Sequence, residues 1–382
     1  MILGIDASNL RAGGGITHLL HLLRVAEPQQ HGIDRVIVWG GRNPLEVLPQ
    51  QDWLDLREEG ELNRPLPKRL WWQQTKLGNL AREECDLLFV PGGLYLGDFR
   101  PYVTMFQNMQ IFETSELNRE RFFGKEWLRL RLLHVAQSQT FRKASGLICL
   151  SEYSRNHLIQ YYADLLDGVP MQLIPHGTAV LPSDSSVEVR AEILGHKNFK
   201  ILCVSTIKKY KHQWNLIDAV GLLRNERIPL ELHLVGGGDP QALRWMREAI
   251  QRNHSDHEFI FYHGSLPYKE TLEWYSNKID IFVFSSTCEN LPVILLEAMT
   301  AGLSIASSDR GPMPEVLKDA GRYFNPESVT SIKNCLRYLI DNPDLCQRLS
   351  AKAKQYSQTY SWKKCAEETL AFFRSVYEGS KA

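Results

Sequence analysis

Residues 280–302 read DIFVFSSTCENLPVILLEAMTAG, and the organisation of the whole chain can be followed outward from them. An apolar strand is expected to end at Phe284. A helix is expected to begin near Pro292, because proline suits the first helical position. The loop between them carries Glu289. Parallel sheets bind ligands outside the carboxyl ends of their strands, so Glu289 is expected to point into a cleft.

Glu297 is the only side chain between residues 291 and 299 that is not apolar. A carboxylate inside an apolar helix is costly unless it has a partner. Two interpretations stay open: an internal cap or ion pair, or a bidentate acceptor for a diol such as a ribose. The backbone N–H groups at the start of the helix, around Leu291, Val293 and Ile294, could meet a phosphate.

The rest of the chain alternates short apolar runs with longer amphipathic segments, which is typical of βα units in parallel sheets. The length of 382 residues favours two domains. The alternation pauses over 176–198, a polar, turn-rich stretch that we interpret as a linker. Strands are expected at 2–6, 35–39, 86–90, 102–106, 147–151, 171–175, 200–205, 230–235, 258–262, 279–284 and 303–307, and helices at 16–25, 114–143, 212–225, 240–252 and 293–301.

Composition narrows the class of protein. Lysine plus arginine number 44 and aspartate plus glutamate also number 44, so the formal net charge is zero. No nucleic-acid partner is expected, and a membrane contact would need a local patch. The seven cysteines are scattered without CxxC spacing, which argues against a zinc site and suggests a reducing compartment. No leader-like segment is visible and the apolar runs are too short to span a bilayer, so a cytoplasmic location is expected.

Residues 201–217, ILCVSTIKKYKHQWNLI, place Lys208, Lys209 and Lys211 after an expected strand. Lysines at the carboxyl end of a strand suit a diphosphate, although a solvated loop explains any single one of them. The glycines at 13–15 and in LVGGGD, 234–239, would let the backbone approach a ligand, but neither turn is a dinucleotide fingerprint. No Walker A, HExxH or GxSxG motif occurs, and no metal site is expected.

Residues 119–143 carry seven lysines and arginines against two glutamates, together with aromatic and leucine side chains. A basic amphipathic helix of this kind can lie on an anionic membrane surface. The alternative is an ordinary domain helix that packs its leucines inward and solvates its arginines.

Glu289 and Glu297 form an E-x7-E pattern within S-x-x-E-N-L-P-V-x-L-L-E-A-M-x-x-G. This pattern resembles the signature of retaining glycosyltransferases with the GT-B fold, in particular family 4. Four further features occur in the expected order: the glycine-rich first turn, CLSEYSRNHL followed by LIPHG, VSTIKKYKH, and HGSLPYKETLEWYSNKIDIFVFSS. The resemblance covers nearly the whole chain and is strongest from about 199 to 325.

The resemblance implies an α/β protein of two Rossmann-like, doubly wound parallel-sheet domains that face an interdomain cleft. Residues 1–180 would form the acceptor-binding domain, and 190–361 the nucleotide-sugar-binding domain. The ending YSWKKCAEETLAFF resembles the family's last helix, so residues 362–382 would pack back on the first domain.

By position, the resemblance makes Glu289 and Lys211 the catalytic residues, with Glu289 on the donor sugar and Lys211 on the diphosphate. Glu297 would hold the ribose, and Gly237 and Leu266 would lie near the base. The other residues that would line the donor site are Gly14, Gly15, Thr206, Lys208, Asn290, Leu291, Pro292 and Val293.

Several positions depart from the family pattern. Thr206 stands where many relatives have an arginine, whose charge Lys208 could replace. His212 and Asn290 stand where glycine is usual. Near TMFQNMQIF many relatives have a cleft histidine, whereas this chain has Gln107 and Asn108, which become the candidates on the acceptor side.

The activity implied is transfer of a hexose from a UDP or GDP sugar to a sugar or lipid-linked sugar, in polysaccharide, O-antigen or glycolipid synthesis. Lys211 and helix-end amides would stabilise the leaving diphosphate, so no metal or other cofactor is expected. Two alternatives stay open. A nucleotide-sugar epimerase has the same fold, but its His/Glu/Asp set could not be matched. A non-catalytic nucleotide-sugar-binding subunit is the other, and the intact Glu289, Glu297 and Lys211 count against it.

Overall fold

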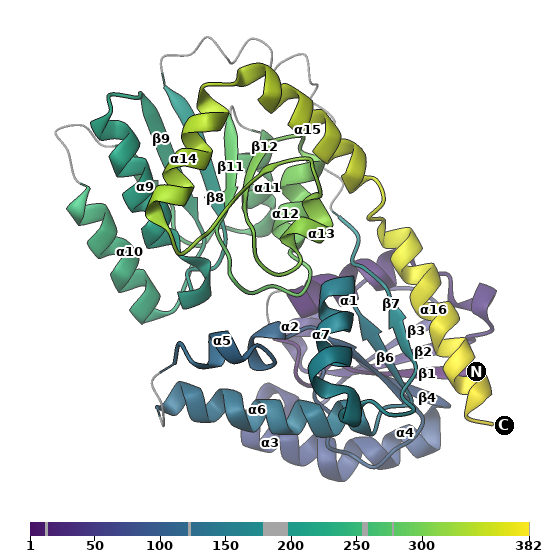
Figure 1. Cartoon of the computed structure of the whole chain (residues 1–382). Coiled ribbons are helices and arrows are strands. Elements are labelled where there is room, and N and C mark those ends of the chain that lie inside the picture. The colour runs from purple at the N-terminus through teal and green to yellow at the C-terminus, as the bar shows by residue number, and fades with distance from the viewer. Residues whose placement is uncertain (12–13, 121–123, 179–197, 254–258, 277–278, 382) are drawn as a thin grey trace. The chain divides into compact units, whose positions relative to one another are not determined.

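The computed structural model describes residues 1–11, 14–120, 124–178, 198–253, 259–276 and 279–381 (Figure 1). The chain forms two compact units. The first comprises Met1–Gly177 together with Ser361–Ala382, and the second comprises Thr178–Tyr360. Most of the expected linker, 176–198, lies outside the described residues.

The first unit is built on a seven-stranded sheet with the order β3-β2-β1-β4-β5-β6-β7, in which every pair is parallel. β1 pairs with β2 on one side and β4 on the other, so the strand order reverses beside β1. The strands are β1 (Ile2–Asp6), β2 (Arg35–Gly40), β3 (Leu54–Glu58), β4 (Leu87–Val90), β5 (Tyr102–Phe106), β6 (Gly146–Cys149) and β7 (Met171–Leu173).

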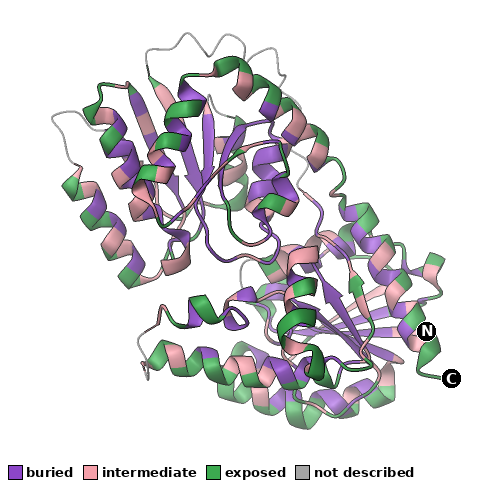
Figure 2. Cartoon of the chain, viewed as in Figure 1, coloured by how far each residue is buried: buried purple, intermediate pink, exposed green. Residues whose placement is uncertain are grey.

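Helices bury this sheet, and every residue of β4, β5 and β6 is buried (Figure 2). Such continuous burial is typical of parallel strands covered on both faces. The helices are α1 (Gly14–Val25), α2 (Arg42–Glu46), α3 (Leu66–Trp72), α4 (Gly78–Glu84), α5 (Thr114–Leu117), α6 (Lys125–Arg142), α7 (Glu152–Tyr162) and α16 (Trp362–Gly379). The 3₁₀ helices are η1 (Pro28–His31), η2 (Gly60–Asn63), η4 (Met109–Ile111) and η5 (Ala163–Leu165), and the π-helical segment η3 (Gln73–Leu77) joins α3 to α4.

The last helix, α16, belongs to the first unit. Phe373 packs against Phe89 of β4 with ring centroids 4.8 Å apart. The hydroxyl of Tyr377 donates a hydrogen bond to Asp86 at 3.3 Å. The chain therefore leaves the first unit after Gly177 and returns to it at Ser361.

The second unit contains a six-stranded sheet with the order β10-β9-β8-β11-β12-β13, again parallel throughout. Leucine, isoleucine and valine side chains from the central strands and from α9 fill its core. Its elements are β8 (Phe199–Val204), η7 (Lys209–Lys211), α9 (Gln213–Asn225), β9 (Leu230–Val235), α10 (Pro240–Arg252), β10 (Ile260–Tyr262), α11 (Tyr268–Ser276), β11 (Ile281–Phe284), α12 (Val293–Thr300), β12 (Ser304–Ser308), α13 (Met313–Leu317), β13 (Arg322–Phe324), α14 (Val329–Ile340) and α15 (Pro343–Ser357).

Two strands were not expected from the sequence, and one expected helix is divided into two. β3 is an edge strand whose LDLRE sequence is mostly polar, and β13 is only three residues long, so neither has an apolar run. The expected helix at 114–143 is instead α5 and α6, with Gly124 at the N-cap of α6. Among the described residues, no helix combines the length and the apolar character that crossing a membrane requires.

A histidine pair lies where the chain leaves and re-enters the first unit. Nδ1 of His18 in α1 is 2.9 Å from Nδ1 of His176, and one nitrogen donates to the other. Trp362 packs against this pair, with its ring 5.7 Å from each of the two imidazoles. A side chain at Gly177 would collide with Trp362, since a Cβ there would lie 2.2 Å from the Trp362 nitrogen.

We expect this pair to make the first unit sensitive to acid. Burial lowers the pKa of His176 from 6.5 to about 4, and it lowers the pKa of His18 in the same direction. Below pH 6.5 the two histidines bind protons in the unfolded chain but stay neutral in the folded chain. Their contribution to the free energy of unfolding is therefore complete above pH 6.5 and is lost as the pH falls toward 4. His176 alone contributes about 3 kcal/mol to this loss.

Urea denaturation of the parent and of His176→Asn, each at pH 7.5 and pH 5, measures the effect. Asparagine can still bond with His18 but does not titrate. The parent should lose more stability between the two pH values than the variant does, and equal losses would refute the assignment.

Candidate functional site

The candidate site of the second unit lies at its topological switch point. β8 pairs with β9 on one side and with β11 on the other. The connection that leaves β8 and the connection that leaves β11 therefore run in opposite directions along the sheet. The loops that follow β8 and β11 therefore meet at the carboxyl edge of the sheet (Figure 1). This is the position at which open α/β sheets bind ligands.

Lys211 and Glu289 form an ion pair at this edge, although 78 positions separate them in the chain. The side chains are 6% and 16% exposed, respectively. The Lys211 ammonium also lies 4.9 Å from the ring centroid of Phe284 and 5.4 Å from that of Tyr210. In a shielded site, a cation and a carboxylate this close stabilise each other's charge. The ammonium can also bind an anion, and the carboxylate can accept a hydrogen bond from a hydroxyl group.

Backbone and hydroxyl hydrogen bonds hold the two loops together. The Ser285 hydroxyl donates to the Lys211 carbonyl at 2.6 Å, and the Thr287 N–H donates to the Tyr210 carbonyl at 2.8 Å. Gln213, at the start of α9, donates from Nε2 to the Thr206 carbonyl at 3.1 Å. The lysine and the glutamate are therefore positioned by a fixed loop pair.

The backbone conformation at His212 accounts for the glycine that the family pattern has at this position. Its backbone has φ 51 and ψ 31, the left-handed region that side chains other than glycine rarely adopt. The residue joins η7 to α9, so this strained conformation turns the chain directly after Lys211. His212 Nε2 lies 3.5 Å from the Thr287 hydroxyl of the neighbouring loop.

Glu297 has two tyrosine partners. The Tyr268 hydroxyl donates to Oε1 at 2.7 Å, and the Tyr275 hydroxyl donates to Oε2 at 3.1 Å. Burial raises the pKa of the Glu297 carboxyl, and the two hydrogen bonds oppose that rise. Both carboxylate oxygens of Glu297 therefore have partners inside the second unit, and these partners are hydroxyls and not the cation of an ion pair. Tyr275 is fully buried, whereas Tyr268 is 45% exposed.

The remaining donor-side candidates of the second unit lie on loops at the same edge. Thr206 and Lys208 are exposed, whereas Asn290, Leu291 and Pro292 are buried just before α12, which begins at Val293. A Cβ on Gly237 would lie 3.3 Å from Ser265, the neighbour of Leu266, so the turns after β9 and β10 approach closely. These turns are joined by a hydrogen bond from the Gly236 N–H to the Gly264 carbonyl at 2.7 Å.

The candidates of the first unit lie at the carboxyl edge of its own sheet. Gly14 begins α1, and Gln107 and Asn108 follow β5. A Cβ on Gly15 would lie 2.9 Å from Leu10 and 3.4 Å from Oε1 of Gln107, so the first turn and the loop after β5 are adjacent. No atom of the described residues lies within 4 Å of a Cβ built on Gly14.

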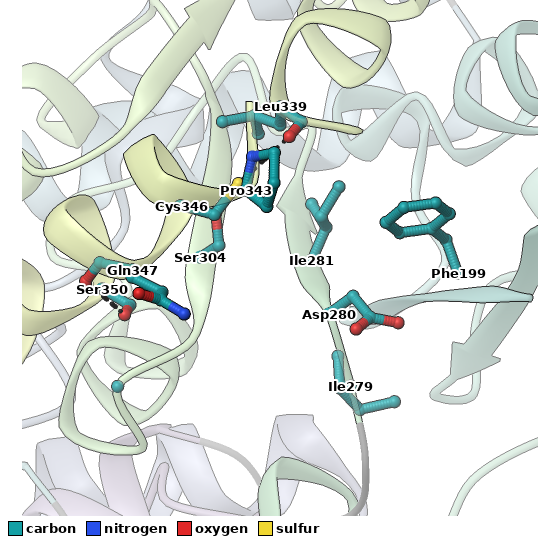
Figure 3. Close-up of a pocket in the computed structure, with 11 residues that line it drawn as sticks. Phe199, Ile279, Asp280, Ile281, Ser304, Leu339, Pro343, Cys346, Gln347 and Ser350 are labelled. Atoms are coloured by element: carbon teal, nitrogen blue, oxygen red, sulfur yellow. Dashed lines mark hydrogen bonds between the residues drawn. The ribbon is translucent and has the colours of Figure 1, made fainter. Parts of the chain in front are cut away.

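A small cavity of about 50 Å³ in the second unit is unrelated to this edge. Figure 3 shows its lining, which includes Phe199, Asp280, Ser304 and Cys346. Phe199 begins β8 and Ser304 begins β12, so the cavity lies at the amino ends of the strands. It therefore carries no part of the site described above.

Sequence reasoning named Lys211, Glu289 and Glu297 but missed the groups that hold them. Tyr210, Phe284 and Ser285 surround Lys211, and Tyr268 and Tyr275 hold Glu297. A signal for the last two existed, because tyrosines at i and i+7 of a helix lie on one face. Together these groups supply a shielded cation for a phosphate and carboxylates for hydroxyl groups.

Comparisons with known proteins show what this chain is similar to. Residues 186–356 match the family of glycosyl transferases group 1. The O-antigen chain mannosyltransferase B of Escherichia coli is 23% identical over 71% of this chain and 70% of its own length. Sucrose-phosphate synthase from Thermosynechococcus elongatus superposes with a TM-score of 0.76 at 15% identity, over 99% of both chains. Anabaena Alr3699/HepE in complex with UDP-glucose superposes with a TM-score of 0.69 at 20% identity, over 97% of this chain and 99% of that one. These similarities show the GT-B fold, and they relate residues 186–356 to the glycosyl transferases of group 1.

Proposed function

We propose that this chain is a retaining glycosyltransferase that moves a hexose from a nucleoside-diphosphate sugar to a sugar or lipid-linked sugar, in polysaccharide, O-antigen or glycolipid synthesis. The observation that carries the proposal is the shielded Lys211–Glu289 pair at the switch point of the second sheet. The names of the relatives agree with it, since one is an O-antigen mannosyltransferase and one solved neighbour holds UDP-glucose.

The chemistry follows from the charges. Negative charge builds on the diphosphate as it leaves, and Lys211, which is almost inaccessible to water, would stabilise that charge strongly. The first N–H groups of α12 would add to this stabilisation. Glu289 would accept a hydrogen bond from a hydroxyl of the donor sugar and orient it. The departing phosphate would take the proton of the acceptor hydroxyl, so that attack occurs on the face that the phosphate leaves and no divalent metal is needed.

A calorimetric titration with UDP, GDP and ADP, with and without Mg²⁺, tests the proposal. We expect one nucleotide to bind without metal. Transfer from the corresponding sugar nucleotide, followed by NMR, should then give a product with the anomeric configuration of the donor. Failure of all three nucleotides to bind, or an inverted product, would refute the proposal.

Glu297 would hold the donor ribose, and this role requires Tyr268 to give up its hydrogen bond. Both carboxylate oxygens already accept from tyrosines, and Tyr268 is the half-exposed one. We expect Tyr268→Phe to tighten nucleoside-diphosphate binding about fivefold, because the ribose no longer competes with that hydroxyl.

Calorimetry on Tyr268→Phe measures this effect. Tyr338→Phe is the matched control, since Tyr338 is a 43% exposed tyrosine on α14 of the same unit. Unchanged affinity in Tyr268→Phe would assign Glu297 a purely structural role.

We also propose that α6 contacts an anionic membrane. Leu128, Leu132 and Val135 are exposed at positions i, i+4 and i+7 of this helix, so they form an apolar stripe. Arg129 and Arg131 are exposed beside them. Part of the expected basic segment, 121–123, lies outside the described residues.

Sedimentation with phosphatidylglycerol vesicles at low salt tests the stripe. Changing Leu128 and Leu132 to serine should weaken binding about tenfold, because each leucine would otherwise bury apolar surface in the lipid interface. Leu222→Ser, at an exposed position on α9, should not. A parent protein that stays in the supernatant would contradict the membrane contact.

A further inference from the structure

A larger hollow, of about 670 Å³, lies wholly within the first unit. One wall is the segment Phe112–Ser115, which leads into α5, and the other is one face of α7. Both segments follow strands whose carboxyl ends lie side by side, β5 and β6 (Figure 1). The volume is in the range of small-molecule sites and would hold a disaccharide.

The two walls are joined by hydrogen bonds. The Tyr162 hydroxyl donates to the Phe112 carbonyl at 3.1 Å, and Nε2 of His157 lies 3.0 Å from the same oxygen. The Tyr153 hydroxyl donates to the Glu113 carboxylate. At its start, α7 has a capping box in which the Ser151 hydroxyl and the Ser154 hydroxyl each accept from the other's backbone N–H. The hollow is therefore preformed.

The lining groups suit sugar hydroxyls and the apolar face of a sugar ring. Glu113 is a buried carboxylate that can accept from hydroxyls, while the amides of Asn156 and Gln160 can both donate and accept. Tyr161 contributes an aromatic ring that is 62% exposed. A flat ring beside fixed polar groups is well suited to a ligand with one polar edge and one apolar face.

The charge of the lining separates a sugar from an anion. None of the residues that line the hollow is lysine or arginine, and the one carboxylate, Glu113, would repel a phosphate. The site at Lys211 has the opposite character, with a shielded cation. The hollow therefore suits a neutral sugar, whereas the site at Lys211 suits an anion.

We propose that this hollow binds a neutral saccharide, the sugar portion of the acceptor, with Tyr161 and Gln160 as specificity-determining contacts. The assignment to the acceptor rests on the proposed transferase function, whereas the saccharide site itself does not. The hollow extends the acceptor side beyond Gln107 and Asn108, to the start of α5 and the length of α7. It would fix the sugar units behind the one that reacts.

Saturation-transfer NMR and calorimetry on the full chain, without any nucleotide, test the proposal with α-1,2-mannobiose, maltose and lactose as probes and mannose 6-phosphate as the anionic comparison. At least one neutral disaccharide should bind. Tyr161→Ala should weaken it about tenfold, through loss of the ring contact, and Gln160→Ala about threefold. Ile159→Ala is the matched control, because Ile159 is 47% exposed on the same helix but does not line the hollow.

The proposal is overturned if no neutral probe binds, if the variants bind as the parent does, or if mannose 6-phosphate binds as tightly as the disaccharides. A parallel UDP, GDP and ADP titration of each variant separates the two hypotheses. If the saccharide site is wrong, nucleotide binding survives while sugar binding is absent or insensitive to Tyr161→Ala. If the transferase function is wrong, no nucleotide binds but the sugar binding and its dependence on Tyr161 remain.

Discussion

Replacing Glu289 with glutamine should reduce sugar transfer by about 10²–10³-fold while binding of the nucleoside diphosphate holds or tightens. Glutamine keeps the size of the side chain, but its amide accepts a sugar hydroxyl more weakly than a carboxylate does. In the structure the Glu289 carboxylate forms an ion pair with Lys211. A diphosphate has to compete with Glu289 for that lysine, so removing the negative charge favours the diphosphate.

The measurement pairs turnover with calorimetry on Glu289→Gln. The control is Glu226→Gln, which removes a carboxylate that pairs with Lys333 at 2.9 Å on the surface of the same unit. The control should keep both activity and affinity. A Glu289→Gln enzyme that turns over normally would remove Glu289 from the reaction, and a loss of nucleotide affinity would place it on the diphosphate instead.

Replacing Lys211 with methionine should have the opposite signature. Nucleoside-diphosphate affinity should fall by about 30- to 100-fold, because a hydrogen-bonded ion pair with phosphate is worth about 2–3 kcal/mol, and turnover should fall with it. Methionine fills the space between the rings of Tyr210 and Phe284, so the packing around position 211 is kept.

Lys211→Met also leaves Glu289 shielded without its cation, which destabilises the fold. The double variant Lys211→Met/Glu289→Gln separates this effect from binding, since it should regain thermal stability but not nucleotide affinity. Lys333→Met serves as the surface control. If Lys211→Met binds UDP or GDP as the parent does, the diphosphate site lies elsewhere.

The sequence predicted the parallel sheets because their central strands are buried on both faces and are therefore continuous apolar runs, as in β8 and β11. It did not predict β3, because an edge strand such as Leu54–Glu58 needs no apolar run. Nor did it predict the end of α5 and the start of α6, where Gly124 provides the N-cap and no proline marks the break.

The residues of the site could be named from the sequence, but their contacts could not. Lys211 and Glu289 follow strands that are not consecutive in the chain, and only the strand order makes β8 and β11 neighbours. The tyrosine partners of Glu297 come from α11, and nothing in the local pattern of α12 indicates which helix covers it. The hollow beside α7 has the same origin, since its two walls are 40 to 50 residues apart in the chain and are brought together by the pairing of β5 with β6.

The contact between Tyr268 and Glu297 also bears on how quickly the site empties. In many enzymes the release of product, and not the chemistry, limits the rate of turnover. A hydroxyl carried on the protein's own helix is held at a far higher effective concentration than a dissolved competitor. We therefore expect Tyr268 to return to the carboxylate as the ribose leaves, which would shorten the residence time of the spent nucleotide and limit inhibition by it.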